Sequence, residues 1–87
     1  MTWYADFTGG VRADLVGLDA TVTEALVDTL AAWLEQGPPR ENRRTLLGVD
    51  IYEAVVAERY LLAYTVDADR ERFVLLWLRH RPGVRPT

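Results

Sequence analysis

The chain has 87 residues, of which 49% are hydrophobic and 26% charged, and its formal net charge is −3. This size and composition predict one small folded domain, spanning residues 1–87, rather than a disordered segment. The lack of cysteine excludes disulfides and cysteine nucleophiles. The acidic balance argues against general nucleic-acid binding, for which a protein usually carries a basic excess.

The N-terminal sequence does not have the pattern of a secretion signal or a membrane anchor. The segment MTWYADFTGG lacks a basic stretch followed by an apolar run. No part of the chain approaches the roughly 20 apolar residues of a membrane span. We therefore expect a cytoplasmic protein that does not bind membranes.

The first half of the chain predicts a strand and two helices. β-Forming residues alternate with smaller or polar ones over Trp3–Phe7, and Val11, Leu15 and Leu18 then recur at helical spacing. We expect the strand to end at the glycines that follow Thr8. The first helix should end between residues 17 and 19.

The second helix has the clearest pattern. Thr21 and Glu24 have the spacing of a capping box, and Gly37-Pro38-Pro39 ends the helix because proline cannot continue it. The two helices should form a hairpin, followed by a polar loop over residues 40–45. One face of the second helix carries its apolar residues, namely Val22, Leu26, Leu30, Trp33 and Leu34.

Residues 52–83 predict three consecutive β-strands. Ala57-Glu58 leave almost no room for a loop between the first two strands, and the polar turn Asp67–Glu71 separates the last two. The strands should therefore pair as an antiparallel meander. In the strand Arg59–Val66, the even-numbered residues should pack on the helices, and the opposite face should include Leu61 and Ala63.

The last strand is apolar on both sides, which predicts a central position in the sheet. Strict alternation would place Phe73, Leu75 and Trp77 on one face. If the helices cover only one side of the sheet, its other side is a partly apolar surface that needs a partner, and we expect Leu61, Ala63 and Trp77 to bind it. The elements together predict an α+β domain, β-α-α-β-β-β, with the helical hairpin on one face of a small, twisted, mainly antiparallel sheet.

Arg79, His80 and Arg81 form the one cluster that suggests catalysis or anion binding. Histidine titrates near neutrality, and flanking guanidinium groups can hold a phosphate and favour the neutral, basic imidazole. A solvated strand end is the more frequent role of three such residues. With a single histidine in the chain, a histidine pair is excluded, and the sequence predicts no metal site and no cofactor.

Other charged residues extend this candidate site. Glu53 and Glu58 are candidate proton acceptors, although a cross-strand ion pair with an arginine such as Arg59 or Arg72 is the more frequent role. The polar loop adds phosphate contacts if it folds over the sheet; otherwise it is an ordinary solvent-exposed loop. Its three arginines are Arg40, Arg43 and Arg44.

Several short motifs follow one another along nearly the whole chain. They are the pair Leu15 and Leu18, the step Leu47-Gly48, the strand tyrosines Tyr60 and Tyr64, and the terminal pair His80-Arg81. In their order and spacing the chain resembles the RelE/ParE superfamily of toxins from bacterial type II toxin–antitoxin pairs. The resemblance implies the β-α-α-β-β-β fold and a catalytic or binding site on the sheet.

The chain departs from the superfamily pattern at three positions. Leu61 stands where the strand usually has an arginine, Val55 where a second arginine is common, and Arg85 near the place of a final tyrosine. For messenger RNA cleavage, the resemblance implies His80, Arg81 and Arg59 as catalytic residues. It implies phosphate or RNA contacts from Arg79, Arg85, Arg40, Arg43 and Arg44.

The resemblance implies a growth-inhibiting toxin that a cognate antitoxin neutralises by covering the exposed sheet face and the hairpin. The substituted arginines favour ParE-like action on DNA gyrase, or another action without RNA cleavage. A RelE-type endoribonuclease acting on ribosome-bound messenger RNA is the enzymatic alternative. A non-toxic interaction module that keeps the fold is the third reading. The sequence leaves homo-oligomerisation open.

Overall fold

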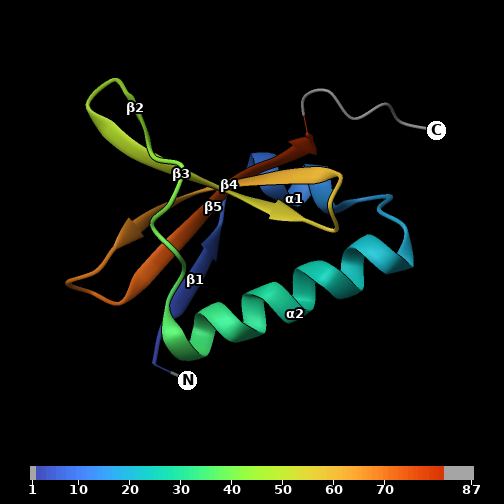
Figure 1. The fold of residues 1–87 in the computed structure, drawn as a ribbon, viewed down its shortest axis with the longest axis horizontal. Helices are drawn as coiled ribbons and strands as arrows, with labels where there is room; N and C mark the ends of the chain where they lie inside the picture. Colours follow the sequence, from blue (N-terminus) through green and yellow to red (C-terminus); the bar gives the residue numbers. More distant parts are fainter. Residues whose placement is uncertain (1, 82–87) are drawn as a thin grey trace.

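The computed structural model describes residues 2–81, so Arg85 lies outside the described residues. The described strands form one sheet in the order β1-β5-β4-β3-β2, in which β1 is parallel to β5 and the other pairs are antiparallel. The α+β class is confirmed, as is the central position of the last strand. The elements are β1 (Tyr4–Phe7), α1 (Gly9–Leu15), α2 (Ala20–Gln36), β2 (Arg44–Leu46), β3 (Val49–Val56), β4 (Tyr60–Asp67) and β5 (Arg72–His80) (Figure 1).

Both helices pack on one face of the sheet. Trp33 of α2 lies against two aromatic rings of the sheet, with centroid distances of 4.6 Å to Tyr64 and 5.7 Å to Phe73, in the range of favourable aromatic pairs. The apolar face predicted for α2 is confirmed, because each of its five residues is buried or packed against the core. The buried core cluster consists of Val11, Leu26, Trp33, Val56, Leu62, Tyr64, Phe73, Leu75 and Leu78.

The N-terminus of α2 is capped by Asp19, and not by the predicted pair of Thr21 and Glu24. The Asp19 backbone is extended, and its carboxylate accepts a hydrogen bond from the Val22 N–H at 2.9 Å. The prediction was wrong because aspartate is as good a cap as threonine and lies where the chain enters the helix. Thr21 consequently lies inside the first turn.

A short strand, β2, was not predicted. Residues 44–46 were expected to belong to a loop or its exit, but they pair with β3 through a tight turn at Leu47-Gly48, whose φ angles are 52° and 79°. Two consecutive positive φ angles are typical of the type I′ hairpin turn, in which glycine is favoured. A three-residue edge strand is too short to show an alternating pattern, so the turn residues were its only signal.

A β-bulge interrupts the pairing of β4 with β5. Ala63 pairs with Trp77, but the next residue of β4, Tyr64, pairs with Leu75, so Leu76 is an extra residue in β5. A bulge of this kind places two residues of one strand opposite one residue of the other, and the alternation of side chains changes there.

The bulge moves Trp77 to the face away from the helices. Leu75 before the bulge and Leu78 after it both lie in the core. The prediction that Trp77 shares a face with Phe73 and Leu75 is therefore wrong, because a one-residue insertion reverses which positions face the core. The Thr8 hydroxyl donates a hydrogen bond of 2.9 Å to the carbonyl of the extra residue, which fixes the bulge against the start of α1.

Tyr64 ties the loop after α2 to the core. Its side chain is fully buried, and its hydroxyl donates a hydrogen bond to the Pro39 carbonyl. Burial, with smaller contributions from Glu41 and Tyr52, raises the pKa of Tyr64 from 10.0 to about 12. The phenol of the folded chain therefore keeps its proton at pH values where that of the unfolded chain ionises.

We expect ionisation of Tyr64 to leave the free energy of unfolding unchanged below pH about 10. As the pH rises from there to about 12, the free energy of unfolding should fall, because the unfolded chain releases the phenol proton first. At about 1.4 kcal/mol per pKa unit, the loss is on the order of 2 to 3 kcal/mol. The chain has no lysine to titrate in this range. Denaturant titrations across this pH range measure the effect. Tyr64→Phe should remove most of it, and an unchanged alkaline slope in that variant would contradict the assignment.

Candidate functional site

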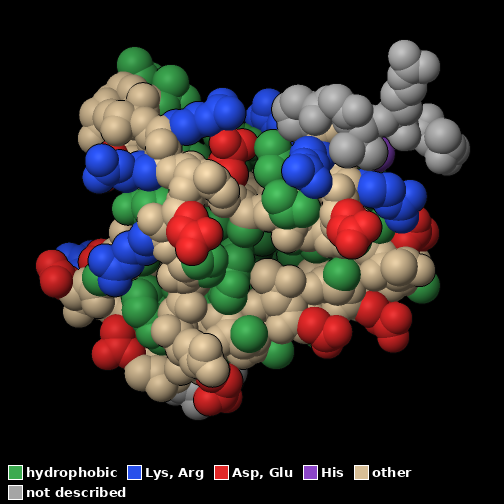
Figure 2. Space-filling view, in the orientation of Figure 1, with side chains coloured by type: hydrophobic (Ala, Val, Ile, Leu, Met, Phe, Trp, Pro, Cys, Tyr) green, Lys and Arg blue, Asp and Glu red, His purple; other side chains and the backbone are tan. Residues whose placement is uncertain are grey.

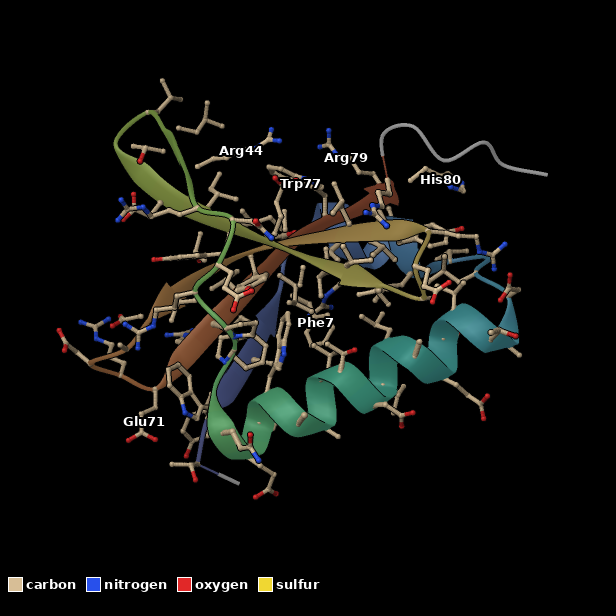
Figure 3. The ribbon with its side chains drawn as sticks, viewed as in Figure 1. Phe7, Arg44, Glu71, Trp77, Arg79 and His80 are labelled. Atoms are coloured by element: carbon tan, nitrogen blue, oxygen red, sulfur yellow. The ribbon has the colours of Figure 1, made fainter. Side chains whose placement is uncertain are left out.

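The face of the sheet opposite the helices, called here the open face, carries the candidate site. Two adjoining pockets lie on it and share Arg44 and Glu53. Figure 3 shows Arg44, Trp77 and Arg79 on this side of the sheet, with Phe7 on the helix side. The larger pocket, about 400 Å³, is lined by Asn42, Arg43, Arg44, Glu53, Leu61 and Arg81. The smaller, about 190 Å³ and called here the Trp77 pocket, is lined by Arg44, Thr45, Leu46, Ile51, Glu53, Trp77 and Arg79.

Two arginines of the open face are held by neighbouring side chains. Arg44 of β2 forms an ion pair with Glu53 of β3, with an Nε to Oε1 distance of 2.9 Å. The Glu53 side chain is only 13% exposed, so the pair is partly shielded from water. The Arg79 guanidinium lies 4.6 Å from the ring centroid of Trp77, which is a cation–π contact.

The predicted cluster at the end of β5 is divided between the two faces. His80 is exposed, lies opposite Tyr60 across the strands, and stacks on that ring with a centroid distance of 4.6 Å. Arg79, one position earlier, points to the open face, as strand alternation requires. The imidazole and the Arg79 guanidinium therefore diverge, and Figure 3 shows them apart.

Arg81 and Arg59 are joined through their backbones. The Arg81 N–H donates to the Arg59 carbonyl at 2.8 Å, and the Arg81 side chain lines the larger pocket. The Arg59 guanidinium instead reaches Asp19 at the N-terminus of α2, with an Nη2 to Oδ2 distance of 3.6 Å. The structure does not bring these two side chains to one site with His80.

The loop arginines differ in their surroundings. Arg40 is exposed, whereas Arg43 lines the larger pocket and lies 3.8 Å from Asp50, a loose ion pair. The prediction that a strand glutamate pairs with an arginine is confirmed for Glu53, whose partner is Arg44. The register set by the unpredicted β2 brings these two residues together.

The residues predicted to bind a partner are not equally accessible. Leu61 lines the larger pocket and Trp77 the smaller one. Ala63, the cross-strand neighbour of Trp77, is fully buried, so it supports the open face without forming its surface. Sequence reasoning missed two apolar residues of the Trp77 pocket, Leu46 and Ile51, which the hairpin turn after Leu46 would have indicated.

Two kinds of feature are absent from the described residues. Within residues 2–81, no group of three or more histidine, aspartate or glutamate side chains is arranged to hold a metal ion. No helix in the same part of the chain has the length and hydropathy that crossing a bilayer would require.

Comparison with solved structures finds this fold in RelE complexes and in free RelE. A chain of the archaeal RelE–RelB complex from Pyrococcus horikoshii OT3 matches with a TM-score of 0.78 and 20% identity, over 97% of this chain and 100% of that one. A mutant of the E. coli toxin RelE in the free state matches at 0.66 and 25%, over 90% and 82%. A chain of the toxin–antitoxin complex RelBE2 from Mycobacterium tuberculosis matches at 0.64 and 22%, over 93% and 100%. No family model and no curated protein matches the sequence.

These matches first define a class of protein, a small α+β domain with a helical hairpin on one face of the sheet. More particularly, the chain has the fold of the RelE/ParE toxin superfamily, and the resemblance inferred from the motifs is confirmed. At identities of 20 to 25%, the similarity is one of fold.

Proposed function

We propose that this chain is the toxin of a type II toxin–antitoxin pair, a growth inhibitor that a cognate antitoxin neutralises. The observation that carries the proposal is the match of at least 90% of the chain to RelE in its free state and to chains of complexes with an antitoxin. The open face supports it, because an uncovered, partly apolar sheet surface on so small a domain generally serves a partner.

Within this function, we propose an action that does not cleave RNA, as for a ParE-like toxin directed at DNA gyrase. A general acid or base must come within hydrogen-bond reach of the atom it serves. His80 stacks on Tyr60, away from Arg79, and the carboxylate of Glu53 is engaged by Arg44. His80 is therefore directed away from the arginines of the open face, and the Glu53 carboxylate is already paired with one of them.

One observation favours the nuclease alternative. Four arginines line the two pockets, and guanidinium groups suit phosphate oxygens. In that alternative His80, Arg81 and Arg59 act on the scissile phosphate, and Arg79, Arg85, Arg40, Arg43 and Arg44 hold the RNA. The presence of Leu61 in place of an arginine supports the third reading, an interaction module without toxicity.

Growth after induction of the chain alone tests the proposal. We expect arrest under either toxin reading, with ribosome-bound messenger RNA left intact if the action is non-nucleolytic. Continued growth, with the folded chain present in the soluble fraction, would contradict the toxin proposal and favour the module. Arrest with cut message would overturn only the non-nuclease part.

His80→Ala separates the two toxin actions. Because His80 is exposed and its ring stacks on that of Tyr60 at the end of the strand, we expect the variant to fold and to arrest growth as strongly as the parent. A histidine acting as general acid or base contributes about 10²- to 10⁴-fold, so rescue of growth by His80→Ala with unchanged solubility would establish the nuclease alternative.

A further inference from the structure

The tip of the β2–β3 hairpin exposes apolar side chains. The hairpin tip, residues 46–49, includes Leu46, Leu47 and Val49, all of which are exposed, and Leu47 is 97% exposed. The φ angle of 52° at Leu47 favours asparagine, aspartate or glycine over a bulky apolar residue. Neither the turn nor the core therefore requires a leucine here, and a group of exposed apolar side chains of this kind indicates contact with another molecule.

A second exposed apolar feature lies on the helix side of the sheet. A pocket of about 230 Å³, called here the helix groove, is lined by residues of β1, α1, α2 and the link between the two helices. Its volume is below the roughly 300 to 1,000 Å³ of most ligand sites, so the groove suits one or two aliphatic side chains. Thr23 is its one polar lining residue, and the others include Leu15, Leu18, Leu26, Val27 and Leu30.

The hairpin tip and the helix groove of one chain do not meet. Figure 1 shows the β2–β3 hairpin projecting from the body of the molecule, on the side away from α2. The tight turn at Leu47-Gly48 joins two paired strands, so no long loop could carry the tip around the sheet to the helices. The tip can therefore fill a groove of this kind only in another copy of the chain.

The charges beside the two apolar features are opposite in sign. The helix α2, which forms one wall of the groove, contains three carboxylates and no basic residue. The segment that carries the hairpin tip, residues 40–50, contains three arginines against two carboxylates. Figure 2 shows apolar side chains at the end of the hairpin with arginine side chains nearby, and acidic side chains along α2. These opposite charges favour the approach of one copy's tip to another copy's groove.

We infer that the free chain self-associates, with the hairpin tip of one copy in the helix groove of a second copy. Leu47 enters the groove, and the arginines that precede the tip lie beside the carboxylates of α2. The contact removes apolar surface of both copies from water. Two tips or two grooves would bring like charges together, so the charges select the contact of a tip with a groove. Self-association does not depend on the proposed function, because a chain that fails to arrest growth can still pair with its copies.

Sedimentation equilibrium of the purified chain tests whether copies associate. We expect the average mass to rise above that of one chain, 9.9 kDa, as the concentration is raised from about 1 to 100 µM, the behaviour of a small and weak interface. The mass of a single chain throughout this range would overturn the inference.

Two substitutions localise the contact. Leu47→Asp places a carboxylate on the tip at a φ angle that aspartate accepts, and Val27→Arg places a guanidinium at an exposed position of the groove where arginine is a good helix former. Each variant should self-associate about tenfold or more weakly, because it loses a buried aliphatic side chain and gains a repulsive charge. Leu47→Asn, which adds no charge, should weaken self-association in the same direction. Self-association of Leu47→Asp as tight as that of the parent would overturn the inference.

Mixing the two charged variants shows which surfaces meet. Leu47→Asp keeps an intact groove and Val27→Arg keeps an intact tip, so the two together can form one native contact that neither forms alone. Fluorescence anisotropy of labelled Val27→Arg, titrated with Leu47→Asp, should show binding at least about tenfold tighter than self-association of either variant. If Val27→Arg alone associates as the parent does, tips meet tips. If Leu47→Asp alone does so, grooves meet grooves. Either result would overturn the inference.

Val55→Arg is the matched control. Val55 is an exposed aliphatic residue of β3, near the end of that strand opposite the hairpin tip, and it does not line the helix groove. Its replacement by arginine should leave self-association nearly unchanged, with circular dichroism confirming the fold of each variant. A loss as large as that of Val27→Arg would show a general effect of added charge and would overturn the inference.

Discussion

Phe73→Ala is expected to destabilise the chain by about 3 to 5 kcal/mol, the usual cost of emptying a phenylalanine site in a core. Phe73 is fully buried at the centre of the cluster that joins α2 to the sheet, with Trp33 packed edge-on against its ring. Since small domains are stable by only about 5 to 15 kcal/mol, this single change would unfold a large share of the molecules. Denaturant unfolding followed by circular dichroism measures the loss.

Two control variants make the Phe73 result specific. Phe73→Leu keeps most of the buried volume and should cost clearly less. Val27→Ala removes an exposed aliphatic group from the same helix–sheet unit and should change stability by less than about 0.5 kcal/mol. If Phe73→Ala were as mild as Val27→Ala, the description of the core would be contradicted.

Gly37→Ala should be the second most damaging of the changes considered. Gly37 ends α2 with φ at 85° and ψ at 155°, a region that is open almost only to glycine. A Cβ built there would lie 2.6 Å from the Trp3 ring. Backbone strain and overpacking each cost about 1 to 3 kcal/mol, so we expect a loss of about 2 to 4 kcal/mol in thermal or denaturant unfolding.

Gly17→Ala is the matched control for Gly37→Ala. Gly17 has nearly the same φ, 83°, but a Cβ there would have no neighbour within 4 Å. Its substitution therefore carries backbone strain without a contact like that with Trp3, and we expect a smaller loss than in Gly37→Ala. Equal losses in both variants would show that Trp3 does not pack against the end of α2 as described.

The fold was predictable where the pattern of residues repeats often enough. The apolar residues of α2, among them Val22, Leu26 and Trp33, recur at helical spacing over several turns. The helix ends at Gly37-Pro38 because proline cannot continue it. A tight turn at Ala57-Glu58, with φ angles of 53° and 62°, was predicted because almost no residues separate the two strands, and in the structure the turn also includes Arg59.

The parts that were missed depend on tertiary pairing. The bulge at Leu76 follows from the pairing of β4 with β5 and from the contact with Thr8, neither of which the local sequence of β5 displays. The bulge turns the Trp77 side chain to the face of the sheet away from the helices. The ion pair of Arg44 with Glu53 depends in turn on β2, whose three residues are too few to show a pattern.

The sequence indicated which residues belong to the candidate site better than it indicated how they are arranged. Arg44, Arg79 and Trp77 were all singled out, and the structure places them on one face around a common pocket. His80 was grouped with Arg79 because they are adjacent in sequence, but adjacent residues of a strand point to opposite faces. The roles assigned to these side chains remain proposals.

Co-expression with the neighbouring gene tests most directly whether this chain, as proposed, is a toxin held inactive by a bound antitoxin. We expect the neighbouring product to co-purify with the chain and to restore growth to cells that the chain alone arrests. Recovery of the chain alone from such cells, with growth the same whether or not the neighbour is expressed, would contradict it.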